Sequence, residues 1–435
     1  TSTSDEEISS KHVCVPITAF PVAGGMRGVL TNVARVMNDQ WQMTYLTHHK
    51  DHEALDLNIE IFGPKGRAPN QFPNIWLYSL MGGWKLFLLL RKCPDYAFLL
   101  PQDGVFTGAF TALLGRMAGI RVICMDHGNV TWLDNFAYRQ EQMRNLRTRA
   151  WLRRLLDRVR YVLYWPSLHA LIRLSAHLTD HFLVVGDEVA EVYTQRLGVP
   201  TSKISRYVYA VDTHRFCPPN HEVFVEMRGK QGIPEDAIVI TLINRLTPEK
   251  GLSFALEWIA TALAELGPDV RSRVRVLIAG NGPLRAQIEE DIQDYGMGDA
   301  CILWGEARPA DVALLLSISN IFLYSGTRGT NYSMAVLEAM AADCAVIATT
   351  APQSNERLLA DGRGIAVKPG NAAEIGAALV HLCNDAVLCR QMGQSAREYI
   401  CTYHTDARLK RDILRASYFA PPLAATGVKK SEESA

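Results

Sequence analysis

Hydrophobic and polar positions in the first half of the chain follow two alternating patterns. Short apolar runs, typical of strands, occur at residues 12–18, 42–48, 96–102, 121–128 and 180–188. Between them, residues 29–37 and 108–119 repeat apolar positions at helical spacing, and a glycine closes the second stretch. Residues 188–197 also show helical spacing and are expected to form a helix after the strand at 180–188. Strands that alternate with helices predict parallel pairing in a doubly wound sheet.

The second half of the chain begins this cycle again. Strand-like runs occur at residues 237–246, 274–280, 301–305, 320–325 and 344–349. Helical patterns occur between them at residues 251–266, 282–296, 310–319 and 332–342. This repetition predicts a second Rossmann-like domain. We expect a linker at residues 211–222, where two prolines and several polar residues interrupt the pattern.

These patterns predict an α/β protein with two Rossmann-like domains that face each other across a cleft. We expect an N-terminal domain at 11–213 and a C-terminal domain at 214–404. A last helix at 405–420 is expected to cross back onto the first domain, followed by a disordered tail at 421–435. Ligands of such sheets bind at the carboxyl ends of the strands. Two half-sites of this kind suit an enzyme that joins two substrates.

Composition and charge narrow the classes of partner and compartment. The 435 residues include 45 basic and 45 acidic side chains, so nothing global indicates a nucleic-acid partner. The nine cysteines are scattered without a CxxC pair or a Cys/His metal spacing, which indicates free thiols in a reducing compartment and no metal site. The polar, acidic N-terminus lacks the features of a signal peptide, and no apolar stretch is long enough to span a bilayer. We therefore expect a cytoplasmic protein.

Six motifs in a fixed order carry a family resemblance. They are "GGMRGVL" (24–30), "VICMDHG" (122–128), "VDTHRFCP" (211–218), "NRLTPEKGL" (244–252), "IAGNGPL" (278–284) and "LEAMAADCAVIAT" (337–349). Together they resemble the retaining glycosyltransferases of family 4, over residues 12–405 or so. The resemblance implies the GT-B fold and transfer of a sugar from a nucleotide-diphosphate sugar, with UDP or GDP as the nucleotide and no cofactor.

Two basic residues follow a predicted strand and precede a predicted helix. Arg245 and Lys250 thus lie at the corner where such domains bind anions. The resemblance implies that they are catalytic residues that hold the diphosphate, which needs positive charge as the glycosidic bond breaks. The alternative is a surface arginine and a helix-capping lysine. Asn244 replaces the glycine that is usual in the family.

The stretch "GTRGTNYSMAVLEAMA" (326–341) is the expected donor site. The resemblance implies that Glu338, a further catalytic residue, accepts hydrogen bonds from the ribose, and that Asn331, Tyr332 and Ser333 offer backbone N–H groups to the diphosphate. Thr330 is uncharged and stands where the family usually has a glutamate, which implies altered sugar contacts or weaker activity. Transfer in this family is described as front-face attack, in which the diphosphate takes the acceptor's proton. The chain has no Asp-x-Asp motif, which agrees with metal-independent catalysis.

Other loops carry weaker signals. Gly24, Gly25 and Met26 lie in the first strand-to-helix turn, and the resemblance places this turn opposite the donor diphosphate, although a tight turn alone explains the glycines. Gly282 lies in a loop near the nucleotide in the family, but helix–strand packing also requires such glycines. His127 ends a strand, where a family histidine contacts the donor sugar near the reacting centre. A purely structural histidine is the alternative.

Residues 139–165 hold eight arginines against Glu141 and Asp157, with leucines and valines at helical spacing. A basic amphipathic helix with aromatic residues is typical of a membrane-surface element. We therefore predict contact with an anionic membrane and a lipid-linked acceptor, at the inner face of the cytoplasmic membrane. The alternatives are an ordinary helix with a solvated basic face, or a site for an anionic carbohydrate or nucleic acid.

The sequence thus predicts a retaining hexosyltransferase that acts on a saccharide or lipid-linked acceptor in polysaccharide or glycolipid assembly. Two alternatives remain open. One is a nucleotide-sugar-binding protein with weak or no transfer activity, because of Thr330. The other is a GT-B-fold nucleotide-sugar epimerase, which needs acid and base carboxylates across the cleft.

Overall fold

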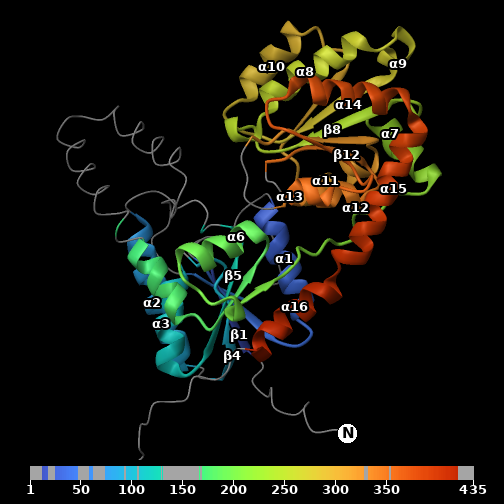
Figure 1. Ribbon diagram of the computed structural model, residues 1–435. Helices are drawn as coiled ribbons and strands as arrows, with labels where there is room; N and C mark the ends of the chain where they lie inside the picture. Colours follow the sequence, from blue (N-terminus) through green and yellow to red (C-terminus); the bar gives the residue numbers. More distant parts are fainter. Residues whose placement is uncertain are drawn as a thin grey trace, which may run out of the picture. The chain divides into compact units, whose positions relative to one another are not determined.

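The computed structural model describes residues 12–17, 25–47, 58–61, 74–92, 95–104, 107–128, 130, 166, 169–327, 332–351 and 354–419. The chain divides into two compact units (Figure 1). Unit 1 comprises Thr1–Phe20, Val33–Tyr207 and Lys410–Ala435, and unit 2 comprises Pro21–Asn32 and Val208–Leu409. The divisions fall inside helices α1 (Gly25–Met37) and α16 (Asp406–Phe419).

Unit 1 contains a parallel sheet with the strand order β3-β2-β1-β4-β5-β6-β7 in its described part. The strands are β1 (His12–Ile17), β2 (Gln42–Thr47), β3 (Asn58–Ile61), β4 (Tyr96–Leu99), β5 (Arg121–Asp126), β6 (His181–Val184) and β7 (Ile204–Arg206). The chain runs outward from β1 to β3 and then returns to the other side of β1 as β4. The direction of the crossovers therefore reverses between β1 and β4.

Helices α2 (Asn74–Lys92) and α3 (Gly108–Ala118) cover one face of this sheet. Their inner side chains, including Leu86, Leu90 and Ala112, pack against strand residues such as Leu46 and Val122. Helix α3 ends at Gly119, whose φ of 69° is easily adopted by glycine. After β6, helix α6 (Asp187–Glu191) continues as a π-helix at Val192–Arg196, followed by a 3-10 turn at Thr201–Lys203.

Unit 2 contains a second parallel sheet with the strand order β10-β9-β8-β11-β12-β13. Its strands are β8 (Ile238–Ile243), β9 (Val274–Ala279), β10 (Cys301–Gly305), β11 (Ile321–Tyr324), β12 (Ala345–Thr349) and β13 (Ile365–Val367). From β8 the chain moves outward through β9 and β10, and then crosses back to β11 on the other side of β8. The reversal in this sheet therefore lies between β8 and β11.

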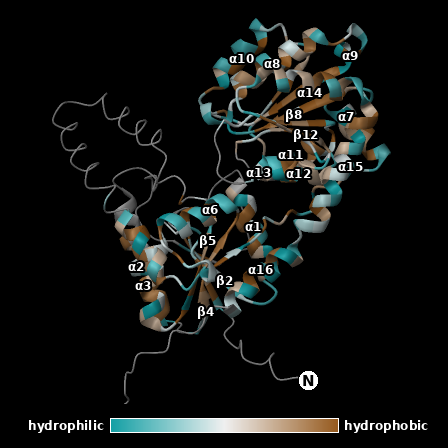
Figure 2. Cartoon of the chain, in the orientation of Figure 1, coloured by the Kyte–Doolittle hydropathy of each residue, from teal (hydrophilic) through white to brown (hydrophobic). Residues whose placement is uncertain are grey.

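Alternating strand residues of unit 2 pack against helices on opposite faces. Ile240 and Leu242 face α8 (Leu252–Glu265), α10 (Arg285–Asp294) and α14 (Ala372–Asn384). Val239 faces α7 (His221–Lys230) and α11 (Pro309–Ser317). Figures 1 and 2 show the hydrophobic strands between these helices. The remaining elements of unit 2 are η4 (Pro248–Lys250), α9 (Pro268–Arg273), α12 (Met334–Ala341), α13 (Ser354–Leu358) and α15 (Ala386–Tyr403).

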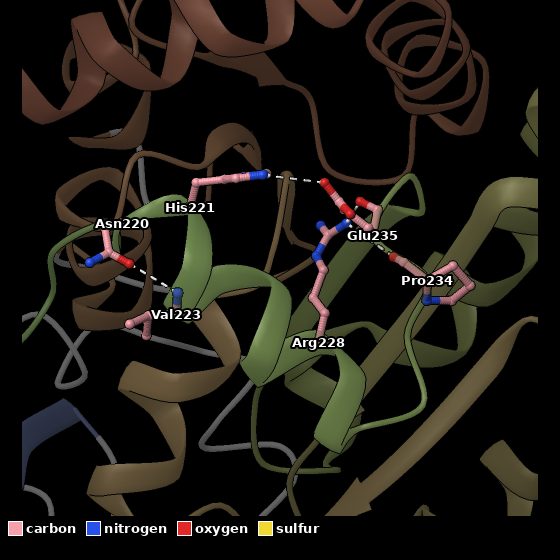
Figure 3. Close-up of polar contacts among 6 residues, drawn as sticks. All are labelled: Asn220, His221, Val223, Arg228, Pro234 and Glu235. Atoms are coloured by element: carbon pink, nitrogen blue, oxygen red, sulfur yellow. Dashed lines mark hydrogen bonds and ion pairs between the residues drawn. The ribbon is translucent and has the colours of Figure 1, made fainter.

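A buried arginine fixes α7 to the sheet of unit 2 (Figure 3). The guanidinium of Arg228 is 1% exposed and donates hydrogen bonds to the carbonyl oxygens of Ile318, Glu235 and Ala237, and to Oδ1 of Asn320. Burial lowers the pKa of Arg228 to about 10, so the group stays charged at neutral pH. Asn220 caps the helix by accepting from the Val223 N–H at 2.9 Å. The predicted linker at 211–222 thus ends inside a helix that begins at His221.

The C-terminal part of α16 packs with unit 1. Lys410 Nζ lies 2.6 Å from Asp39 Oδ2, and the Arg121 guanidinium donates to the Ser417 carbonyl. Among the described helices, no single one is long and apolar enough to cross a membrane. Ala372–Asn384 with Ala386–Tyr418, bent by 106° at the break, meets the criterion by length and composition only.

Candidate functional site

The reversal of the unit 2 sheet brings two loops to one edge. The loop after β8 covers residues 244–251, and the loop after β11 covers residues 325–333, of which 328–331 lie outside the described residues. Because β8 and β11 are adjacent and parallel, their carboxyl ends meet. Open α/β sheets bind ligands at such a reversal. The predicted phosphate-binding motif and the predicted donor motif therefore lie side by side.

Backbone contacts hold the two loops together. The Ser325 hydroxyl donates to the Lys250 carbonyl at 2.8 Å, and the Thr327 N–H donates to the Glu249 carbonyl at 3.0 Å. Gly251 lies between them with a φ of 65°, and a Cβ there would meet the Ser325 carbonyl oxygen at 2.2 Å. A glycine is therefore required at the end of the "NRLTPEKG" motif for both conformation and space.

Two cations gather on the first loop. Lys250 ends the short helix η4, and its Nζ lies 5.6 Å from the centre of the Tyr324 ring. Arg245 is exposed, and its Nη2 lies 3.3 Å from Glu249 Oε1. Burial and, next, the positive charge of Arg245 lower the pKa of Lys250, and the carboxylate of Glu249 offsets part of this effect. An anion bound between the two cations would relieve this repulsion.

The loop after β9 packs against the first loop through glycines. A Cβ at Gly280 would lie 1.8 Å from the Asn244 carbonyl oxygen, and one at Gly282 would lie 2.4 Å from the Leu246 carbonyl oxygen. The Leu246 N–H donates to the Asn281 carbonyl at 3.0 Å. Gly282 is thus explained by close backbone packing. The buried side-chain amide nitrogen of Asn244 has no hydrogen-bond partner in the described parts of the chain, and it can donate to a ligand.

Glu338 lies in α12 and faces the start of α1. A Cβ on Gly28 would lie 3.8 Å from Glu338 Oε1, so little space separates the two helices. The carboxylate is half-buried, and no residue of the described ranges is seen to hydrogen-bond to it. Burial raises the pKa of Glu338 to about 7, while the charge of Arg215 acts in the opposite direction. A carboxylate in such surroundings is stabilised when a ligand donates hydrogen bonds to it.

The remaining predicted donor residues of unit 2 are distributed around α12 and α1. Ser333 immediately precedes α12, and its side chain hydrogen-bonds to Tyr324. The Tyr332 ring meets the buried His404 ring edge-on, at a centroid distance of 6.0 Å. Gly25 is the first residue of α1 and Met26 the second. Gly24, Thr330 and Asn331 lie outside the described residues, as does the segment 139–165.

His127 belongs to unit 1 and follows β5. Its Nε2 lies 3.0 Å from Gln102 Oε1, which can only accept, so Nε2 carries the proton. Its Nδ1 then accepts a hydrogen bond from the Tyr207 hydroxyl at 2.7 Å. Burial lowers the pKa of His127 to about 3, which keeps the ring neutral. Both ring nitrogens thus have hydrogen-bond partners within unit 1.

Sequence reasoning did not single out the acidic residues beside His127. The Asp126 carboxylate accepts from the Tyr193 hydroxyl at 2.6 Å and from the Gly128 N–H at 2.6 Å, and burial raises its pKa. Asp103, after β4, accepts from the Thr107 N–H at 3.1 Å. Both acids lie at carboxyl ends of strands next to the reversal of unit 1. The available signal was an acidic residue at the end of a buried strand for Asp126, and one a few residues after a buried strand for Asp103.

The described residues contain neither a disulfide nor a cluster of metal ligands. The cysteines in this part of the chain are free thiols, most of them buried. No group of three or more His, Cys, Asp or Glu residues there could hold a metal ion.

Comparisons with known proteins agree with this architecture. The chain is 23% identical over 233 residues to an alpha-D-kanosaminyltransferase of Streptomyces kanamyceticus, covering 53% of this chain and 57% of the relative. It is 27% identical over 241 residues to the putative glycosyltransferase EpsD of Bacillus subtilis (strain 168), covering 55% and 59%. The chain thus spans less than two thirds of the length of these relatives.

Solved structures match over nearly the whole chain. Anabaena Alr3699/HepE in complex with UDP has a TM-score of 0.70 at 14% identity, covering 93% of this chain and 98% of that one. WaaG, a glycosyltransferase involved in lipopolysaccharide biosynthesis, has a TM-score of 0.67 at 15% identity, covering 94% and 99%. These similarities establish the GT-B fold with its two Rossmann-like units. Residues 223–399, less than half of the chain, match the family described as Glycosyl transferases group 1.

Proposed function

We propose that this protein is a retaining glycosyltransferase that moves a sugar from a nucleotide-diphosphate sugar to an acceptor. One observation supports the proposal: two cations, Arg245 and Lys250, lie on one loop at the reversal of the unit 2 sheet, beside the single acid Glu249 of that loop. In the same unit, Glu338 is a half-buried carboxylate for which the described residues provide no hydrogen-bond donor. A nucleoside diphosphate would offer an anion to the two cations and hydroxyl donors to Glu338.

In the proposed reaction, Arg245 and Lys250 hold the diphosphate and stabilise the negative charge that grows as the glycosidic bond breaks. Glu338 accepts hydrogen bonds from the ribose hydroxyls. The leaving diphosphate oxygen takes the proton of the attacking acceptor hydroxyl, so transfer occurs on one face of the sugar with retention. The two cations supply the charge that a metal ion provides in other enzymes, and we therefore propose a metal-independent reaction without a cofactor.

The proposed donor is a UDP- or GDP-hexose, and UDP is the first choice. Structures of Anabaena Alr3699/HepE with UDP and with UDP-glucose share the fold of this chain at TM-scores of 0.70 and 0.69. In this proposal the segment 328–331, with Thr330 and Asn331, completes the contacts to the sugar and diphosphate. Thr330 favours a sugar that needs no charged contact at this position.

The proposed acceptor is a saccharide or a lipid-linked saccharide, as in polysaccharide or glycolipid assembly. An alpha-monoglucosyldiacylglycerol synthase of Streptococcus pneumoniae is 28% identical over 130 residues, 30% of this chain and 28% of that protein. The basic segment 139–165 supports an acceptor at an anionic membrane on its cytoplasmic side. We therefore include a peripheral membrane location in the proposal.

A binding protein without transfer activity is the second candidate. The observation that favours it is Thr330, which replaces the charged residue usual in the resembling family. In that case the nucleotide sugar would bind at the same loops of unit 2, and neither hydrolysis nor transfer would follow.

The test is incubation of the protein with UDP- and GDP-hexoses, with and without diacylglycerol and lipid-linked saccharide acceptors. We expect release of the nucleotide and a product whose anomeric configuration by NMR matches the donor. Lys250→Ala should lower the rate by about a hundredfold or more. Lys230→Ala is the control, because Lys230 is an exposed lysine that pairs with Glu226 on α7. Nucleotide-sugar binding without hydrolysis or transfer for every donor would instead establish the second candidate.

A further inference from the structure

Large hydrophobic side chains are exposed on two helices of unit 1. On α2, Leu80 is 53% exposed, Trp84 is 64% exposed and Leu88 is 38% exposed. On α3, Leu113 is 39% exposed and Met117 is 74% exposed. The spacing of four residues places the members of each set on one side of their helix. Each helix therefore presents a hydrophobic stripe to its surroundings in addition to the side that it buries.

The two stripes belong to one face, because α2 and α3 are neighbours. A Cβ on Gly83 would lie 3.2 Å from the Phe110 Cβ, so the helices are in close contact at this point. Leu86 and Leu90, on the opposite side of α2 from the stripe, are buried in the core of unit 1. Figure 2 shows the hydrophobic colouring along both helices. We use the name α2–α3 face for the exposed side chains of Leu80, Trp84, Leu88, Leu113 and Met117, together with the cations Arg91, Lys92 and Arg116.

The charged residues of helices α2 and α3 are all basic. Neither α2 nor α3 contains an aspartate or a glutamate, while they carry Lys85, Arg91, Lys92 and Arg116. Lys85 is paired with Glu60 at 3.0 Å. Arg91, Lys92 and Arg116 are exposed near the ends of the helices, and the Arg91 guanidinium lies 5.8 Å from the centre of the Phe87 ring. The two helices thus contribute hydrophobic side chains and cations but no anion, while the neighbouring acids Glu60 and Asp180 interact with Lys85 and Arg116.

Charge complementarity identifies the partner. A second copy packed symmetrically on this face would place two surfaces of the same positive charge against each other. The segment 139–165 of this chain carries eight arginines against two acids, so it would also meet like charge. An anionic lipid surface attracts the cations, and its interfacial region accommodates leucine, methionine and tryptophan side chains. We propose that the α2–α3 face is a docking surface for an anionic lipid bilayer.

In this arrangement α2 and α3 lie in the plane of the lipid headgroups. Trp84, Leu80 and Leu88 insert below the headgroups, and Arg91, Lys92 and Arg116 contact the lipid phosphates. This docking uses residues that the proposed donor site does not contain. It therefore stands or fails independently of the transfer reaction, and independently of the role proposed for residues 139–165.

The test is cosedimentation of the full chain with vesicles of phosphatidylcholine, with and without phosphatidylglycerol. We expect binding to the anionic vesicles that weakens as salt is added. The double variant Trp84→Ser/Met117→Ser should weaken this binding about tenfold or more, and Lys92→Gln/Arg116→Gln should weaken it about tenfold. Phe254→Ser is the matched control, because Phe254 is a 54% exposed aromatic residue of unit 2. All variants should keep the melting temperature and the UDP affinity of the native protein.

Three outcomes would overturn the proposal. The first is equal binding of anionic vesicles by the native protein and by both double variants. The second is loss of binding only when arginines of 139–165 are neutralised, which assigns the contact to that segment. The third is a vesicle-free dimer, detected by light scattering, that Trp84→Ser/Met117→Ser dissociates. None of these outcomes depends on sugar transfer, so they leave the proposed function untouched.

Discussion

Glu338 is a carboxyl group whose surroundings favour its neutral form until a ligand arrives. Burial raises its pKa to about 7, above the ordinary value of 4.5. In the unliganded protein its stabilising contribution is therefore present below pH 4.5 and is lost as the pH rises through about 7. Ribose hydroxyls would donate hydrogen bonds to the ionised form. Nucleotide binding should thus favour the ionised form of Glu338 and lower its pKa, which is opposite to the effect of burial.

This linkage predicts a pH-dependent affinity for UDP. As the pH falls through about 7, the affinity should weaken by up to about tenfold per pH unit, because the proton must be removed before the ribose binds. Isothermal titration calorimetry between about pH 6 and pH 8 measures this slope. Glu338→Gln corrects for titration of the nucleotide's own phosphate and should lack the added slope. Identical slopes for the two proteins would contradict the role of Glu338.

At the scale of elements, the site depends on how closely three loops approach one another. Replacing Gly280 or Gly282 by alanine should displace the loop after β9, because the new Cβ atoms would lie 1.8 Å and 2.4 Å from carbonyl oxygens of residues 244 and 246. We expect a loss of stability of about 1–3 kcal/mol and weaker UDP binding, measured by denaturant unfolding and calorimetry. Gly229→Ala in α7, where a Cβ meets nothing within 4 Å, is the control. A loss of equal size in that variant would contradict the explanation.

The sequence predicted these elements unevenly. Apolar runs with clear borders located β9 and β10 well, whereas the run at 237–246 extended three residues beyond the end of β8 at Ile243. The interpretation of "NRLTPEKG" as a loop after the strand was correct, and Glu338 lies inside α12 as predicted. Helix α7 was missed because two prolines and polar residues around 211–222 indicate a linker, whereas its stability comes from Arg228 and its distant carbonyl partners. The partners of His127 come from positions 102 and 207, and their meeting depends on the sheet. Contacts between residues so far apart in the chain leave no local pattern.

At the scale of the whole molecule, a substitution that destabilises the core of one unit should leave the stability of the other unit unchanged. Arg228→Met removes a charged group that donates hydrogen bonds to the carbonyl oxygens of Glu235, Ala237 and Ile318. These carbonyl oxygens would then lose that donor. We expect unit 2 to lose about 3 kcal/mol or more, with unit 1 unchanged. Hydrogen exchange measured by mass spectrometry reports both units at once. Lys230→Met, on the exposed side of the same helix, should change neither, and equal destabilisation of both units by Arg228→Met would contradict the prediction.

The division of α1 between the units affects how this protein can be cut into pieces. Residues 21–32 belong to unit 2, although more than 170 residues separate them from its main segment at 208–409. A fragment that starts at residue 208 would lack Gly28 beside Glu338, and Asn32, whose side chain donates to the Ala210 carbonyl at 2.7 Å. Its Glu338 would lose this neighbour, so we expect its pKa to move from about 7 toward the ordinary value of 4.5. A circularly permuted chain that joins residues 21–32 to the fragment through a designed linker is the smallest piece that retains the native surroundings of this carboxylate.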